Sequence, residues 1–322
     1  MITNETPRWA IHPQPHNSEL FESWLMRLSQ ENFVPARFVL DELGVRDIVG
    51  IHKPLTVENV SRLAQISTVD QTRILDTHLG SFSQQTRAVY TTPFFTPSRR
   101  KAETSVQFRV CPNCLSDHQK PHILLRWALE MVCLCPIHRV PLLEICPKCS
   151  TTFNINSLIR DNPLASCWKC NCDLRQYKQP QTHNFDSAIA FQEHLLQLKI
   201  GEVVLLPQAR SVSSENFVRI VQKLFLALGS QPLFQSFSRF FDTAFRLQIQ
   251  LLDDTFSTAF RHTNALSICA WIFANPIARL LLLEEYVQLK IQHTIAVRLL
   301  SAFRRVQESI RLPNTVIYQS QS

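Results

Sequence analysis

Nine of the ten cysteines lie between Cys111 and Cys172, and this clustering constrains the fold more than any other feature of the 322-residue chain. Most of them occur in pairs of potential ligands separated by two residues, a pattern that in a reducing compartment indicates metal binding and not disulfides. The tenth, Cys269, lies between Ile268 and Trp271 on an apolar segment. We expect it to be a buried, unreactive thiol.

The spacing predicts two metal sites with four protein ligands each. The ligands of the first are Cys111, Cys114, Cys135 and His138, and those of the second are Cys146, Cys149, Cys167 and Cys170. In each site 17 to 20 residues separate the two pairs, as in a structural zinc ribbon. Four protein ligands fill the coordination shell of Zn²⁺ and leave no position for water, so we expect two structural zinc ions.

Other side chains in this region are alternative ligands: Cys133, Cys172, His118 and His122. Cys135 is preferred to Cys133 because its Cys-Pro-x-His turn resembles the Cys-Pro-x-Cys turn that begins at Cys146, where proline stiffens the backbone. Cys170 is preferred to Cys172 because it keeps the two-residue spacing from Cys167.

No catalytic or cofactor-binding residues other than the zinc ligands are expected. The five glycines form no phosphate-binding loop, so the chain is not expected to hydrolyse ATP. The acidic pairs Asp253-Asp254 and Glu284-Glu285 are adjacent residues in expected helical surroundings, where neighbouring side chains point apart and do not converge on a metal. A zinc deaminase would also need a His-x-Glu motif and an open coordination position.

The first part of the chain is expected to form short amphipathic helices. Ser18 is expected to cap a helix whose apolar residues recur at helical spacing from Leu20 to Leu28. Pro35 suits the first turn of a second helix, and Gly44 supplies its end.

Two further short helices are expected after this pair. Thr56 caps a helix with an apolar stripe that includes Val57 and Val60, and another helix runs from about Asp70 to Leu79. Four short helices with tight connections suggest a helix-turn-helix module, a shape that serves both DNA contact and simple packing.

Positive charge is spread thinly along the chain. The net charge is +7, and no segment forms a polybasic arm. The linker from Tyr90 to Val106 holds the triplet Arg99, Arg100 and Lys101, the best candidate for a contact with nucleic-acid phosphates. An exposed, solvated linker is the competing interpretation.

The last part of the chain is expected to be entirely helical, over 184–200, 214–229, 232–252, 256–274 and 277–309. The fold class is therefore mainly α, with an N-terminal helix-turn-helix module, a central tandem zinc-ribbon region and a C-terminal helical domain. The expected domains are 1–105, which includes the linker, 106–180 and 181–322. A run of phenylalanines from Phe234 to Phe245 is interpreted as a buried helix face.

No stretch is long and apolar enough to span a bilayer, and the N-terminus does not resemble a signal or transit peptide. We therefore expect a cytoplasmic, bacterial protein without membrane contact.

Three motifs together resemble the TniQ family. They are the helix from Glu19 to Leu28 followed by Arg37 to Gly44, the segment beginning Arg62-Leu-Ala-Gln-Ile, and the turns Cys135-Pro-Ile-His138 and Cys146-Pro-Lys-Cys149. The likeness covers roughly residues 15–178, and its specificity lies in the combined order of the motifs. The remainder of the chain matches only in being helical.

The resemblance implies a non-enzymatic targeting subunit of a DNA transposon that carries a separate AAA+ ATPase and a separate transposase. Its partners would be a guide-RNA effector complex of the Cascade type, the AAA+ regulator, target DNA near or through that complex, and a second copy of the chain if it forms a homodimer. In some members the TniQ-type protein itself reads a DNA attachment site, which is the alternative. The thin spread of charge favours the RNA-guided adaptor.

Overall fold

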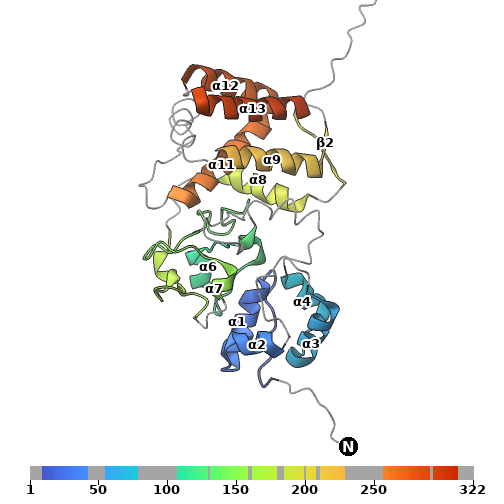
Figure 1. Ribbon diagram of the computed structural model, residues 1–322, viewed down its shortest axis with the longest axis vertical. Helices are drawn as coiled ribbons and strands as arrows, with labels where there is room; N and C mark the ends of the chain where they lie inside the picture. Colours follow the sequence, from blue (N-terminus) through green and yellow to red (C-terminus); the bar gives the residue numbers. More distant parts are fainter. Residues whose placement is uncertain are drawn as a thin grey trace, which may run out of the picture. The chain divides into compact units, whose positions relative to one another are not determined.

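The structure is a computed structural model of the chain (Figure 1). It describes residues 9–42, 55–78, 107–129, 131–158, 162–179, 185–198, 201–207, 211–228, 257–290 and 293–310. The chain divides into two compact units, Met1–Thr182 (unit 1) and His183–Ser322 (unit 2). Most described elements are helices, which confirms the mainly α class. The expected boundary near residue 105 falls inside unit 1, and it stays a prediction.

Unit 1 begins with short helices that share one apolar core. They are α1 (Phe21–Glu31), α2 (Ala36–Glu42), α3 (Val57–Ser67) and α4 (Gln71–Thr77). Trp24 and Leu28 of α1 pack in this core with Val39 of α2, Leu63 of α3 and Ile74 of α4. Each of these helices is too short to be stable alone, so burial of this shared face holds them in place.

The ends of these helices test the expected caps. Thr56 caps α3 as expected, because its Oγ1 accepts a hydrogen bond from the Asn59 amide at 3.1 Å. The expectation for Ser18 is wrong: α1 begins at Phe21, and Ser18 has a left-handed φ of 57°. Ser18 instead lies in a turn just before the β-bridge between Glu19 and Leu124, and its carbonyl accepts a hydrogen bond from the Leu125 amide at 2.7 Å.

The apolar spacing of α3 predicted a longer buried face than the helix has. Val57 is 81% exposed, although Val60 and Leu63 are buried. Helix α3 and helix α4 contact each other across the turn at Thr68, which has a left-handed φ of 55°. A helix-turn-helix role for this pair stays a prediction.

The cysteine-rich part of unit 1 has little regular structure. Its helical turns are α6 (Pro112–Asp117), η4 (Leu125–Ala128), α7 (Ile155–Leu158) and η5 (Leu174–Tyr177). Isolated β-bridges join the rest, among them Val110↔Leu143 and Gln107↔Asn154. Buried apolar side chains, among them Val110, Trp127 and Leu142, form the core of this segment.

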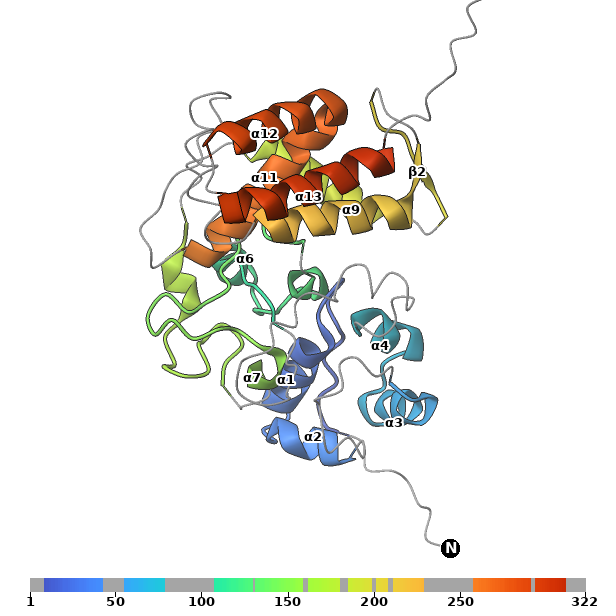
Figure 2. The ribbon, with the colours of Figure 1, turned by 45° about the horizontal axis from the view of Figure 1, so that its top comes forward.

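The described part of unit 2 is a helical bundle with a small hairpin (Figure 2). Its elements are α8 (Asp186–Gln197), β1 (Val203–Val204), β2 (Val212–Ser213), α9 (Ser214–Leu228), α11 (Ser257–Ala274), α12 (Pro276–Lys290) and α13 (His293–Ile310). Helix α11 packs on α8 and α9, and α13 packs on α9 and α12. Cys269 on α11 is fully buried, as expected.

The expectation that this part of the chain is entirely helical is wrong, because β1 and β2 pair as an antiparallel hairpin between α8 and α9. The described helices follow the expected spans with one further correction. A single helix over 277–309 is wrong, because α12 and α13 are separate helices that pack on each other. Glu284 of α12 accepts hydrogen bonds from Arg304 and Gln307 of α13, both at 3.2 Å. The expected helix over 232–252 and the phenylalanine run within it lie outside the described residues.

Within the described part of the chain, no helix is long and apolar enough to cross a membrane.

Candidate metal centres

Three turns of the cysteine-rich region share one backbone pattern. In each turn, the carbonyl of the first cysteine accepts a hydrogen bond of 2.8 Å from the amide of the residue four positions later. These bonds run from Arg139 to Cys135, from Ser150 to Cys146 and from Asn171 to Cys167. These three donors all have a left-handed φ of 52° to 56°. β-Bridges Leu134↔Pro141, Ile145↔Thr152 and Ser166↔Asp173 close each turn. The pattern places the first residue and the fourth residue of each turn on the same side, as a pair of ligands requires.

The fourth turn is built differently. Cys111 is the N-cap residue of α6, Pro112 occupies the start of the helix, and Cys114 lies in its first turn. Proline suits this position because its fixed φ is helical and its missing N–H would have no partner there. A helical start therefore brings the two thiols to one side without a left-handed residue.

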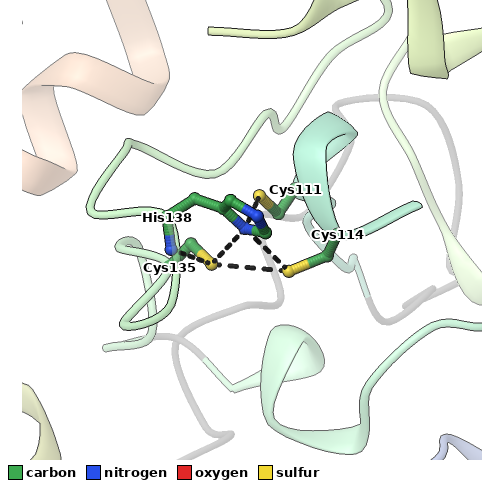
Figure 3. A group of neighbouring side chains, drawn as sticks. All are labelled: Cys111, Cys114, Cys135 and His138. Atoms are coloured by element: carbon green, nitrogen blue, oxygen red, sulfur yellow. Dashed lines mark hydrogen bonds between the residues drawn. The ribbon is translucent and has the colours of Figure 1, made fainter. Parts of the chain in front are cut away.

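The first group brings together Cys111, Cys114, Cys135 and His138 (Figure 3). Nδ1 of His138 lies 3.6 Å from Sγ of Cys111, 3.3 Å from Sγ of Cys114 and 3.6 Å from Sγ of Cys135. The Sγ atoms of Cys114 and Cys135 are 3.5 Å apart. Metal–sulfur bonds of about 2.3 Å in a tetrahedron would put ligand atoms about 3.7 Å apart, so the group can hold one metal ion.

Asp117 orients the histidine of this group. Nε2 of His138 lies 2.7 Å from Oδ2 of Asp117, while Nδ1 faces the sulfurs. Burial lowers the pKa of His138, but hydrogen bonds with Cys135 and Asp117 outweigh it and raise that pKa overall. A carboxylate on the outer nitrogen fixes the tautomer in which Nδ1 carries the lone pair. Asp117 was not predicted from sequence, although its position three residues after Cys114 places it on the next turn of α6.

Shared protons tie the thiols of this group to one another. Hydrogen bonding with Cys111 and Cys135 raises the pKa of Cys114, while hydrogen bonds from Cys111 and Cys114 lower the pKa of Cys135. A divalent cation would replace these protons, because the thiolate is the form that binds metal.

The second group brings together Cys146, Cys149, Cys167 and Cys170. The Sγ atoms of Cys146 and Cys170 are 3.7 Å apart, and so are those of Cys149 and Cys167. These are again tetrahedral separations, and four sulfurs could hold a second metal ion.

Cys172 is adjacent to these four residues, and its Sγ is 3.4 Å from Sγ of Cys146, so the choice of Cys170 as the ligand stays a prediction. In each of the three similar turns, the amide of the first cysteine donates a hydrogen bond to the carbonyl of the residue five positions later. Cys172 has this position, and Val140 and Thr151 are its equivalents. By the same correspondence Cys170 matches His138 and Cys149.

The other alternative ligands are placed elsewhere among the described residues. Cys133 is buried but is not part of the first group. His122 lies between the rings of His16 and His118, with centroids 4.3 Å and 4.4 Å away. His118 and His122 are therefore packed against other histidines and belong to neither metal group.

A buried hydrogen-bond network around Glu19 connects α1 to the loop of the first group through Ser23. Oε2 of Glu19 lies 2.6 Å from the guanidinium of Arg27, and both side chains are almost fully buried. Oε1 of Glu19 also accepts a hydrogen bond from the hydroxyl of Ser23, and that hydroxyl accepts from the amide of Ile123 at 2.9 Å. A buried charge is stable only when it is paired and its remaining polar atoms are hydrogen-bonded, as those of Glu19 are here. No spacing rule in the sequence signalled that Glu19 and Arg27 would be internal.

The expected phosphate-contact triplet, Arg99, Arg100 and Lys101, lies outside the described residues.

Comparison with protein families finds a match to the TniQ model over residues 10–142. The matched segment contains α1 to α4 and the whole of the first metal group. A comparison with curated proteins gives no match.

Proposed function

Because the chain carries a TniQ domain over residues 10–142, which implies involvement in transposon target selection, we propose that it is a non-enzymatic target-selection adaptor. In this proposal the protein connects a target-recognition complex, an RNA-guided effector of the Cascade type, to recruitment of an AAA+ regulator and a transposase. The TniQ family is one of non-enzymatic targeting proteins, which supports an adaptor and not a catalyst.

The charge of the α3–α4 segment favours a protein partner over direct reading of DNA. Residues 55–78 contain two basic side chains, Arg62 and Arg73, against three acidic ones, Glu58, Asp70 and Asp76, a net charge of −1. Arg73 is moreover hydrogen-bonded to the carbonyl of Pro15 at 3.1 Å. A helix pair that reads DNA needs positive charge toward the phosphates, because phosphate contacts supply most of the affinity.

We further propose that both metal groups hold Zn²⁺ in a structural role. One group offers three sulfurs and one imidazole nitrogen, and the other offers four sulfurs. Soft thiolate ligands in tetrahedral arrangement suit zinc, and four protein ligands leave no position for a reacting water.

The deciding experiment is binding of the purified protein, at physiological salt, to two separate probes. One is duplex DNA of the element's attachment site, and the other is the element's guide-RNA effector complex. Binding to the complex without binding to free DNA is the expected result. Tight, site-selective binding to free DNA would replace the adaptor with the direct site-reader.

Salt titration separates the same alternatives. Binding through many phosphates weakens steeply, with log K falling by about 0.9 per log salt for each phosphate neutralised. The affinity of a protein partner that docks through apolar contacts should change little between low and physiological salt. A protein that binds neither probe but still binds the AAA+ regulator would be a simple scaffold, and the target-recognition half of the proposal would fail.

A further inference from the structure

A groove of about 670 Å³ opens on the surface of unit 1, and its lining includes Ser166, the residue before Cys167 of the second metal group. Its apolar lining is formed by Ile11, Phe33, Pro121, Pro163, Leu164 and Ala165. The volume is within the range of about 300 to 1,000 Å³ that is usual for small-molecule pockets. The groove therefore has room for one bulky side chain with its neighbours.

Hydrogen bonds hold the walls of the groove in place. The side-chain amide of Asn32 donates to the carbonyl of Ile11 at 2.7 Å, and its Oδ1 accepts from the amide of Ile11 at 2.9 Å. Nε2 of Gln30 donates to the carbonyl of Asn162 at 3.0 Å, which ties the end of α1 to the segment before Pro163. The groove is thus preformed by contacts between three parts of unit 1.

Phe33 at the rim has two unfavourable features. Its φ is +57°, at the position just after α1. There the amide of Val34 donates a hydrogen bond to the carbonyl of Ser29, and the amide of Phe33 donates to the carbonyl of Gln30. This hydrogen-bond pattern is the helix ending at which glycine is usual, because other residues are strained there. Phe33 is also 92% exposed. A strained and solvent-exposed aromatic side chain at the mouth of a groove is suited to contact with a partner.

The charged side chains that face the groove are predominantly basic. Lys120 and Arg175 line it and are 58% and 48% exposed, while Glu31 is the acidic residue of the lining. Lys120 pairs with Glu31 at 2.8 Å, and Arg175 pairs with Asp173 at 2.7 Å. The Lys120–Glu31 pair is exposed and rests on one hydrogen bond, so it contributes little stability and an incoming carboxylate can compete for Lys120. Arg175 holds Asp173 through both Nε and Nη2, so an incoming carboxylate would share this guanidinium with Asp173. Arg27, the third basic residue, is buried against Glu19.

We infer that this groove is the docking site for a peptide segment of a partner protein, in which one bulky apolar side chain is flanked by acidic residues. The apolar side chain would lie among Phe33, Pro163 and Leu164, and the carboxylates would meet Lys120 and Arg175. The inference rests on the proposed adaptor function, which requires a partner-binding face, and it specifies the chemistry of that partner.

The test is selection of random dodecapeptides displayed on phage against the full-length, metal-loaded protein. Enriched peptides are then synthesised with a fluorescent label, and their binding is measured by anisotropy. We expect them to share a Leu, Phe or Trp next to Asp or Glu. Their affinity should fall at least tenfold in Phe33→Gly and in Lys120→Glu.

The controls separate binding from folding. Phe33→Gly relieves the left-handed strain, so its melting temperature should equal or exceed that of the wild type while binding is lost. Phe38→Ala removes a half-exposed aromatic of α2 outside the groove, and Lys178→Glu reverses an exposed charge outside it. Both controls should leave peptide affinity unchanged.

Several results would overturn the inference. These are the absence of enriched peptides, enriched peptides without acidic residues, or affinities that Phe33→Gly and Lys120→Glu do not change. Binding of a labelled single-stranded oligonucleotide that depends on Phe33 would assign the groove to nucleic acid instead.

Failure of the groove and failure of the adaptor function give different results. If the Phe33→Gly variant associates with the effector complex and the AAA+ regulator as the wild type does, the groove is not the docking site. If the wild type associates with neither, the proposed function itself is wrong.

Discussion

Glu22 on α1 is fully buried, and its Oε2 has no hydrogen-bond partner among the residues that the structure describes. Burial raises the pKa of this carboxyl from its usual 4.5 to about 7. Below about pH 7 the neutral acid is therefore the predominant form in the folded protein. A buried carboxylate of this kind costs stability once it ionises.

Because the pKa of Glu22 is higher in the folded state, its contribution to stability decreases as pH rises from about 4.5 to about 7. The loss amounts to about 3 kcal/mol above pH 7, from about 1.4 kcal/mol per pKa unit. Glu22→Gln should remove most of this loss, so the variant should be more stable than the wild type at pH 8 and similar at pH 5. Urea unfolding at both pH values measures the difference, and the exposed Glu58→Gln is the control. An equal effect of Glu22→Gln at both pH values would contradict the assignment.

Asp117 should contribute to metal affinity although it is not a ligand. Asp117→Asn weakens the hydrogen bond that orients His138, and loss of such a partner lowers metal affinity about 10- to 100-fold. Competition with a chromogenic chelator measures this affinity. Asp76→Asn, an exposed change on α4, should have no effect. The second group should retain its metal in both variants.

At the scale of elements, the repeated turn distinguishes ligands from their neighbours. The ligand position is the fourth residue of the turn, and the sixth residue contributes only its carbonyl, as Val140 and Thr151 do. Cys149 is the fourth residue of its turn, and Cys172 is the sixth residue of its turn, although the sulfur atoms of both lie close to those of other cysteines in the group.

Cys149→Ser should therefore reduce the metal content from two ions to about one per chain and destabilise the turns around it. Cys172→Ser should retain both ions, since it leaves the four thiols of the group intact. Elemental analysis of the purified, reduced proteins measures the content. Loss of an ion from Cys172→Ser with no loss from Cys149→Ser would reverse the ligand assignment.

At the scale of the whole molecule, the two units have different sources of stability. In unit 2, helices α9 and α11 pack through large apolar side chains such as Phe217 and Phe273, whose ring centroids are 5.0 Å apart. The cysteine-rich part of unit 1 has few regular hydrogen bonds, and metal ions in its two ligand groups would cross-link it.

A strong chelator at neutral pH should therefore unfold unit 1 selectively. Amides of residues 107–158 should lose protection from hydrogen exchange, and those of α1 should follow, since the Leu20 amide donates to the carbonyl of Ile123 and Ser23 holds the Ile123 amide. Amides of α9 and α11 should keep their protection. Exchange followed by mass spectrometry, before and after chelation, makes the comparison, and equal loss in both units would contradict it.

The sequence by itself determined the features that depend on local spacing. Ligand pairs, caps such as Thr56 and amphipathic helices are encoded within a few residues, so the two groups of four ligand residues and the mainly helical class could be predicted. Only the tertiary structure decided the features that depend on residues far apart in the chain. The burial of Glu19 with Arg27, the packing of α12 against α13, and the groove beside Phe33 all arise where distant segments meet. Their energies depend on desolvation and shape at those contacts, which no local pattern of residues specifies.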